Sequence, residues 1–127
     1  MTFGVFLVED EPQVQDSLKV VIEGFLRAEV IGAVQTEAEA VTWLQAHEGG
    51  WHLLVVDLLL AQGSGLGVLA SLAHCPQKGT VVALTNAASQ DNREECLRLG
   101  ADAVFDKAAE VNEFLTYCAA RAEDHSG

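Results

Sequence analysis

The chain has 127 residues and a formal net charge of −12 at pH 7, and half of its residues are hydrophobic. This length and composition predict one folded domain with a substantial core rather than a disordered chain. Nucleic acids bind through cationic side chains that neutralise phosphates, and the presence of only seven Lys and Arg argues against direct nucleic-acid binding. A cation, or a partner with a basic or amphipathic surface, is the better expectation.

The sequence contains no apolar run of the roughly 20 residues that a membrane span needs. No basic region precedes the first apolar residues, so we expect no signal peptide. The sequence has three cysteines, Cys75, Cys96 and Cys118. Their odd number and wide spacing indicate that they are small buried residues of a protein in a reducing compartment, and argue against a zinc site. We therefore expect a cytoplasmic protein. The histidines share no spacing, and we expect them on the loop surface without a role: His47, His52, His74 and His125.

Short apolar runs alternate with segments of helical spacing along the whole chain. Pro12 suits the first turn of a helix, and Thr36 with Glu39 forms a capping box at the start of another. Strands are expected at residues 3–8, 29–34, 53–56, 80–84 and 103–105. Helices are expected at residues 12–27, 36–47, 68–72, 89–99 and from 111 onward. This alternation predicts a doubly wound α/β fold, a three-layer (βα)5 sandwich, with one domain over residues 1–122 and a frayed tail at residues 123–127.

The expected strand at residues 53–56 runs directly into a carboxylate, Asp57. Burying an unpaired carboxylate costs free energy, so Asp57 is expected where the strand emerges at the edge of the sheet. Ligands bind at this edge in open parallel sheets. Taken alone, however, Asp57 is better explained as a turn or cap residue, because Asp is common in both positions.

Three other expected strands also end in polar residues: Glu9 and Asp10 follow the first, Thr85 ends the fourth and Lys107 follows the fifth. Each alone has an ordinary explanation, such as helix-dipole compensation for the acidic pair. The carboxyl ends of parallel strands meet in one crevice, where carboxylates repel unless a cation lies between them. Carboxylate oxygens with room for water and phosphate describe a Mg²⁺ site. Lys107 and Thr85 can neutralise and hydrogen-bond the oxygens of a transferring phosphoryl group.

These residues resemble the receiver domain of two-component response regulators, the flavodoxin-like group that includes the bacterial chemotaxis regulator. The resemblance covers essentially the whole chain, from residue 5 to residue 107. The positions that match the family pattern, in order, are Glu9, Asp10, Asp57 as phosphoacceptor, Gly65, Thr85, Gly100-Ala101-Asp102 and Lys107.

The resemblance implies a sheet order of 2-1-3-4-5 and a Mg²⁺ ion beside the phosphoacceptor. By that resemblance, Asp10 and Asp57 bind the ion directly. Glu9 acts through a water molecule, and the backbone carbonyl of Leu59 completes the protein ligands.

The resemblance also implies a signalling role rather than that of an enzyme acting on separate substrates. Asp57 would take a phosphoryl group from a phosphohistidine of a sensor histidine kinase or a histidine phosphotransfer protein, while Thr85 and Lys107 hold its oxygens. Hydrolysis of the acyl phosphate would end the signal. The output would be contact with a downstream protein, or a homodimer, through the helix at 89–99, the strand at 103–105 and the last helix.

The chain departs from the family pattern around this site. Ala61 and Ala108 stand where the family usually has Pro, so the peptide before Ala108 is expected to be trans. Asn86 replaces a small residue and is expected to narrow access to the phosphoacceptor. Val104 occupies the position of the family's switch aromatic, and the adjacent Phe105 should face the opposite side of the strand. We therefore expect activation by rearrangement of the loop after the fourth strand, without an aromatic rotamer switch.

Three other functions are alternatives to a phosphorylatable receiver. A receiver that no longer cycles phosphate and serves as a protein-binding module is favoured by Val104 and Asn86. A flavin-binding enzyme would need an anion-binding loop after the first strand, and the acidic residues at 9–11 would repel a flavin phosphate. A metal-dependent phosphatase with an Asp nucleophile usually adds a cap, for which this chain has no room.

Overall fold

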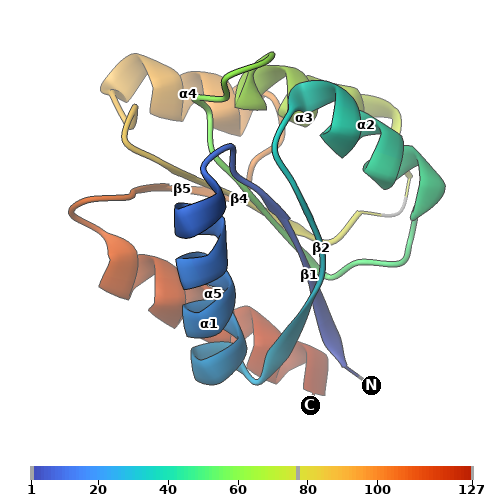
Figure 1. The fold of residues 1–127 in the computed structure, drawn as a ribbon, viewed down its shortest axis with the longest axis vertical. Helices are drawn as coiled ribbons and strands as arrows, with labels where there is room; N and C mark the ends of the chain where they lie inside the picture. Colours follow the sequence, from blue (N-terminus) through green and yellow to red (C-terminus); the bar gives the residue numbers. More distant parts are fainter. Residues whose placement is uncertain (1, 77, 127) are drawn as a thin grey trace.

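A computed structural model describes residues 2–76 and 78–126 of the chain. The strands form one parallel sheet in the order β2-β1-β3-β4-β5, which confirms the predicted fold class and sheet order (Figure 1). The strands are β1 (Phe3–Val8), β2 (Ala28–Val34), β3 (Leu53–Val56), β4 (Thr80–Thr85) and β5 (Ala103–Asp106). The helices are α1 (Pro12–Leu26), α2 (Glu37–Ala46), α3 (Gly65–Ser71), the short 3-10 helix η1 (Leu72–His74), α4 (Gln90–Arg98) and α5 (Val111–Ser126).

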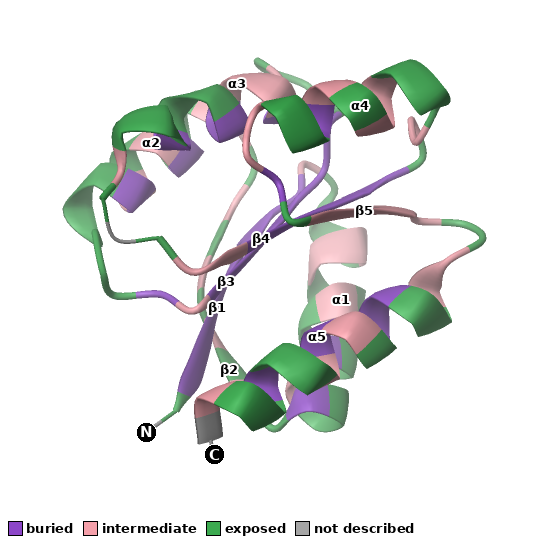
Figure 2. Cartoon of the chain, turned by 180° about the vertical axis from the view of Figure 1, so that it is seen from behind, coloured by how far each residue is buried: buried purple, intermediate pink, exposed green. Residues whose placement is uncertain are grey.

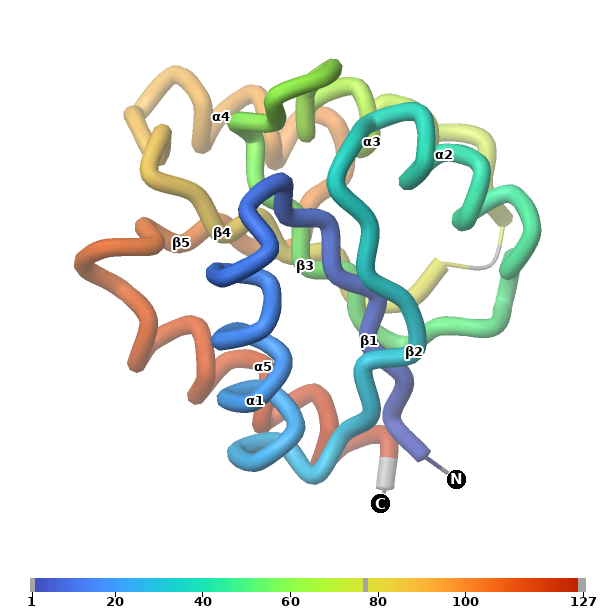
Figure 3. Tube along the Cα trace, in the orientation of Figure 1, coloured from blue at the N-terminus to red at the C-terminus, as the bar shows by residue number. Residues whose placement is uncertain are grey.

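Helices cover both faces of the sheet: α1 and α5 lie on one face, and α2, α3 and α4 lie on the other (Figures 1 and 3). Side chains alternate along each strand, so each face supplies one core cluster. In β1, Val5 and Leu7 pack towards α1 and α5, whereas Phe6 and Val8 pack towards α2 and α3. The central strands β1 and β3 are buried throughout, whereas the edge strand β2 alternates between half-buried and exposed residues (Figure 2).

The strand register brings the carboxyl ends of the central strands to one edge of the sheet. Val8 of β1 pairs with Val56 of β3. The backbone ladder continues past both strand ends, because the Asp57 N–H donates to the Val8 carbonyl at 3.0 Å and the Lys107 N–H donates to the Thr85 carbonyl at 3.0 Å. The polar residues that follow the strands are therefore held by the sheet itself.

Capping residues lie where the sequence predicts them at the starts of α2 and α4 and at the end of α4. Thr36 and Ser89 each accept a hydrogen bond from a backbone N–H in the first turn of α2 and α4, and Gly100 after α4 has a φ of +106° that favours glycine. The start of α3 differs, because Ser64 caps a helix that begins at Gly65 rather than at residue 68. None of the helices within residues 2–76 and 78–126 has the length and apolar character needed to cross a bilayer.

The end of α5 contradicts the predicted frayed tail at residues 123–127. The helix continues through Ser126, while Gly127 lies outside the described residues. The His125 ring lies 5.5 Å from that of Phe3 and 4.1 Å from that of His52, measured between centroids. The expectation of a loop-surface position is therefore wrong for His125, and His52 is half-buried against it.

Candidate functional site

Lys107 joins two carboxylates at the carboxyl edge of the sheet. Its Nζ lies 2.5 Å from Glu9 Oε1 and 2.6 Å from Asp57 Oδ2. The side chains are largely shielded from water, with exposed fractions of 2% for Glu9, 8% for Asp57 and 17% for Lys107. The predicted convergence of these strand ends is thus present, and the ammonium group neutralises charges that would otherwise repel.

Glu9, Asp10 and Asp57 form a group that could hold a metal ion. One carboxylate oxygen from each lies within 4.8 Å of the others. A donor set made only of carboxylate oxygens suits a hard cation such as Mg²⁺ or Ca²⁺ and disfavours zinc, which prefers nitrogen and sulfur. The residues present therefore fit the predicted ion.

Burial and ion pairing shift the pKa values of these groups. Desolvation raises the pKa of Glu9, because the bonds from Lys107 and from the Glu11 N–H only partly offset it. Desolvation acts to lower the pKa of Lys107, but its hydrogen bonds and charge interactions with Asp57 and Glu9 outweigh that effect and raise it. Lys107 is therefore a fixed positive charge at neutral pH.

The turn after β3 orients the Asp57 carboxylate. Its Oδ1 accepts a hydrogen bond from the Leu59 N–H at 3.0 Å, so the lysine and the turn each hold one oxygen. Gly65 packs against the same turn, because a Cβ added there would lie 2.2 Å from the Asp57 carbonyl oxygen. A glycine is therefore required at this position of close backbone approach.

Thr85 is fully buried at the end of β4, one strand away from Asp57. Its Oγ1 accepts a hydrogen bond from the Ala87 N–H at 3.1 Å. The Ala87 carbonyl in turn accepts a bond from the Asn92 side chain at 2.7 Å. The hydroxyl is thus connected to the loop between β4 and α4, and the side chain of Asn86 in that loop is exposed.

Val104 and Phe105 face opposite sides of β5, as predicted. Val104 packs against the cluster that contains residues of α2, α3 and α4. Phe105 packs against α5, with its ring centroid 6.1 Å from that of Phe114 and 5.7 Å from that of Tyr117. The peptide bonds of the described residues are all trans, including the one between Lys107 and Ala108.

Two polar side chains near the site were not predicted from the sequence. Gln15 of α1 donates to the carbonyls of Glu9 and Val34 at 3.2 and 3.1 Å and so joins the ends of β1 and β2. Arg93 of α4 binds the loop after β4 and the edge strand β5. Both bind backbone carbonyls, which every residue has, and the Glu110 partner of Arg93 is 17 residues away, so no sequence pattern identified them.

The family of the chain follows from its sequence as well as its fold. The profile described as the response regulator receiver domain matches residues 5–119. The chain therefore belongs to the response regulator receiver domain family, the receiver modules of two-component signalling systems. No match was found among curated proteins.

Solved receiver structures share the fold. A DNA-binding response regulator of the LuxR family from Staphylococcus aureus is 15% identical with a TM-score of 0.83, and the match covers 94% of this chain and 98% of that one. A Burkholderia pseudomallei response regulator, solved with a phosphorylated aspartic acid, a calcium ion and citrate, is 23% identical with a TM-score of 0.79 over 97% of this chain and 70% of that one. A CheX–CheY–BeF3–Mg complex from Borrelia burgdorferi matches at 18% identity and a TM-score of 0.77, covering 91% and 88%.

Proposed function

We propose that Asp57 accepts a phosphoryl group from a phosphohistidine of a sensor histidine kinase or a histidine phosphotransfer protein. The observation that carries this proposal is the contact of Lys107 with both Asp57 and Glu9 in a cluster that also contains Asp10. In the transfer, a carboxylate oxygen bonds to phosphorus while the P–N bond breaks. The partner's imidazole keeps the electron pair and takes up a proton.

The chain's own residues mainly position and neutralise charge, which is the dominant task in phosphoryl transfer. The Leu59 N–H fixes the orientation of the Asp57 carboxylate. Lys107, already 2.6 Å from Asp57, offsets the charge of the incoming phosphoryl oxygens, and the Thr85 hydroxyl can donate to one of them. Asn86 directly follows Thr85 and is exposed, so we expect its side chain to narrow the approach to Asp57.

The cluster has the donors to hold Mg²⁺, with Asp10 and Asp57 as direct ligands, the Leu59 carbonyl as a further ligand and Glu9 acting through water. When bound, the ion supplies positive charge against the carboxylates and the phosphoryl oxygens. Lys107 donates a hydrogen bond to Glu9 as well as to Asp57, so its ammonium group and the ion would together offset the charge of these carboxylates. The calcium ion in the Burkholderia structure shows that a divalent cation accompanies a phosphorylated aspartate in that relative.

Intact-mass measurement after incubation with acetyl phosphate and Mg²⁺ tests the proposal. We expect the wild type to gain the mass of one phosphoryl group, and both Asp57→Asn and a wild-type sample with EDTA to gain none. Asp106→Asn is a matched control, because Asp106 is the last residue of another strand, β5, and its carboxylate accepts hydrogen bonds from the N–H groups of Ala108 and Ala109. No gain in the wild type, or an equal gain in Asp57→Asn, would refute the role of Asp57.

The second candidate function is a protein-binding receiver that no longer cycles phosphate. It is favoured by Val104, which leaves the usual switch position without an aromatic ring. The same mass experiment separates the two, because this candidate predicts no gain in the wild type although the fold and the cluster are intact.

We further propose that the protein acts in the cytoplasm and signals to a downstream protein, or forms a homodimer, through α4, β5 and α5. A shallow groove on this surface is lined by residues of β5 and α5, including the half-buried Phe105 and Tyr117. The net charge of −12 favours a partner with basic side chains around an apolar centre.

A further inference from the structure

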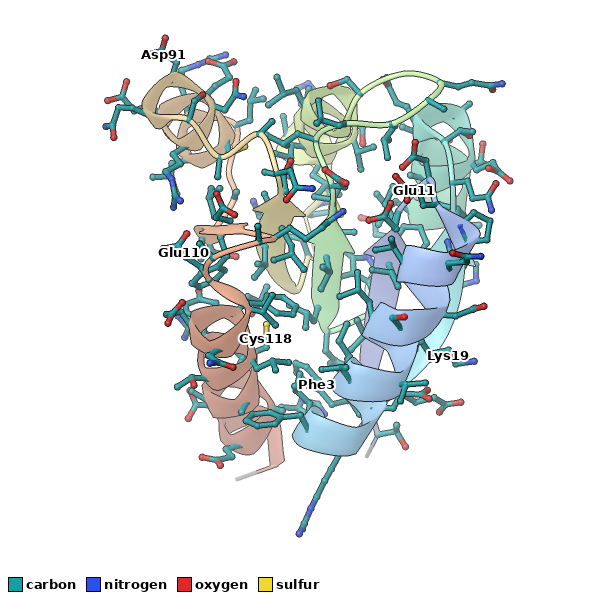
Figure 4. The ribbon with its side chains drawn as sticks, turned by 60° about the vertical axis from the view of Figure 1, so that its left-hand side comes forward. Phe3, Glu11, Lys19, Asp91, Glu110 and Cys118 are labelled. Carbon is teal, nitrogen blue, oxygen red and sulfur yellow. The ribbon has the colours of Figure 1, made fainter. Side chains whose placement is uncertain are left out.

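Arg93 connects three segments of the molecule with one guanidinium group. Its Nε donates to the Ala88 carbonyl at 3.0 Å, its Nη1 to the Val104 carbonyl at 3.1 Å and its Nη2 to Glu110 Oε1 at 2.6 Å. Ala88 belongs to the loop after β4, Val104 to β5, and Glu110 to the loop before α5. Glu110 lies between α4 and the first turn of α5 (Figure 4).

The groups that Arg93 binds are close in the chain to Thr85 and Lys107. Ala88 is three residues after Thr85, whose hydroxyl is bound to the same loop. On the other side, the carboxylate of Glu110 accepts the Asp106 N–H at 2.8 Å, and Asp106 immediately precedes Lys107. A displacement of either site residue therefore reaches Arg93 through short lengths of chain.

The geometry of these bonds suits a positioning role. β5 is one of the two edge strands of the sheet, and Arg93 binds the Val104 carbonyl there. The guanidinium is planar, so bonds to Ala88, Val104 and Glu110 fix three acceptors in one arrangement. Hydrogen bonds from a charged donor are also stronger than neutral ones.

We infer that Arg93 is the positioning residue that couples the phosphorylation state of Asp57 to β5 and the start of α5. This inference rests on the proposed function. A phosphoryl group on Asp57 places oxygens where the Thr85 hydroxyl can donate a hydrogen bond to them. Movement of Thr85 towards these oxygens displaces the loop after β4. The Ala88 carbonyl then moves out of hydrogen-bond distance of Arg93. The ion pair between Arg93 and Glu110 then weakens, and the hydrogen bond from the Asp106 N–H to Glu110 opens more often.

The coupling needs no aromatic rotamer. Val104 provides a backbone carbonyl at the position where the family pattern has an aromatic side chain, and Phe105 packs on the opposite face of the sheet against α5. Arg93 therefore takes over the connection between the loop after β4 and the surface formed by α4, β5 and α5.

Amide hydrogen exchange measured by NMR, with and without phosphorylation by acetyl phosphate and Mg²⁺, tests the inference. In the wild type we expect phosphorylation to speed exchange of the Asp106 amide by about fivefold or more, the range of typical coupling between sites. In Arg93→Ala we expect an undiminished mass gain but fast exchange in both states. Arg93→Lys keeps the charge without the planar guanidinium, so exchange of its Asp106 amide should also not change on phosphorylation. This variant provides the test if Arg93→Ala does not fold.

Arg98→Ala is the matched control, because Arg98 lies on the same helix and pairs with Glu95. It should respond to phosphorylation as the wild type does. A mass gain in the wild type without any change at Asp106, or a wild-type response in both Arg93 variants, would overturn the role of Arg93 and leave the proposed function intact. The absence of a mass gain in the wild type would overturn both.

Discussion

Replacement of Lys107 by alanine removes the only cation bonded to Glu9 and Asp57 among the described residues. Both carboxylates are nearly inaccessible to water, so neither can regain a full hydration shell. The Lys107→Ala variant should therefore have a lower free energy of unfolding than the wild type in the absence of divalent cations. Addition of these cations should raise that free energy more in the variant than in the wild type.

The size of the effect follows from the contacts. Hydrogen bonds to charged groups contribute about 1.5–3 kcal/mol each, and removal of one partner from a buried ion pair costs about 3–5 kcal/mol. Glu9 can offset part of this cost by taking up a proton, because burial already raises its pKa. We expect the free energy of unfolding at pH 7 to fall by about 2–3 kcal/mol in EDTA. Mg²⁺ at about 100 times its Kd should restore about 2.7 kcal/mol.

Urea unfolding followed by circular dichroism in EDTA and in Mg²⁺ measures both quantities. Lys19→Ala is the matched control, because Lys19 is exposed on α1 (Figure 4), and its effect should stay within about 0.5 kcal/mol. If Lys107→Ala unfolds at the same urea concentration as the wild type in EDTA, the ion pair does not stabilise the site. If Mg²⁺ stabilises the variant less than the wild type, the vacated carboxylates do not form the cation site.

Three further predictions concern packing, pH and thiol reactivity. Gly65→Ala should lose about 1–3 kcal/mol in urea unfolding, because the new Cβ would lie 2.2 Å from the Asp57 carbonyl oxygen; unchanged stability would contradict the close approach. The raised pKa of Glu9 means that the folded state binds more protons than the unfolded state from pH 4.5 up to the folded pKa, so this carboxyl lowers stability as the pH rises. The increase in thermal midpoint on adding Mg²⁺ should therefore grow with pH over that window, and a decrease would contradict it. Burial raises the pKa of the Cys118 thiol to about 12 and also raises that of Cys96, so at most one of the three thiols should react with DTNB at pH 8 before unfolding. Rapid reaction of more than one thiol in the native protein would refute the burial of Cys96 and Cys118.

The strand ends of the site were predictable because each lies next to a continuous apolar run. A parallel strand that is buried on both faces has a continuous apolar sequence. The apolar runs at Leu53–Val56 and Thr80–Thr85 therefore predict both the strands and the polar residues at their carboxyl ends. Once the strands are parallel, their register brings Asp57 and Lys107 to the same edge. The 2.5–2.6 Å contacts of Lys107 could not be predicted, because they depend on rotamers across three strands.

The elements that were mispredicted depend on local capping or on distant contacts. Glycine disfavours helix, so the segment that includes Gly65 suggested a loop, but the Ser64 cap starts α3 there. The polar end of α5 suggested fraying. The Phe3 and His52 rings, remote in sequence, pack against His125 and hold the last turn.

The four residues from Val104 to Lys107 show how one short segment can serve both the site and the outer surface. The Val104 carbonyl binds Arg93, the Asp106 N–H binds Glu110, and the Lys107 side chain reaches Asp57. A strand of this length is nearly inextensible, so a displacement at its Lys107 end has to appear at its contacts with α4 and the start of α5. The ring of Phe105 cannot carry that displacement to α4, because it is packed on the α5 face. The connection from the site to α4 therefore runs through the backbone carbonyls that Arg93 binds. It needs no aromatic side chain at position 104, where this chain has valine.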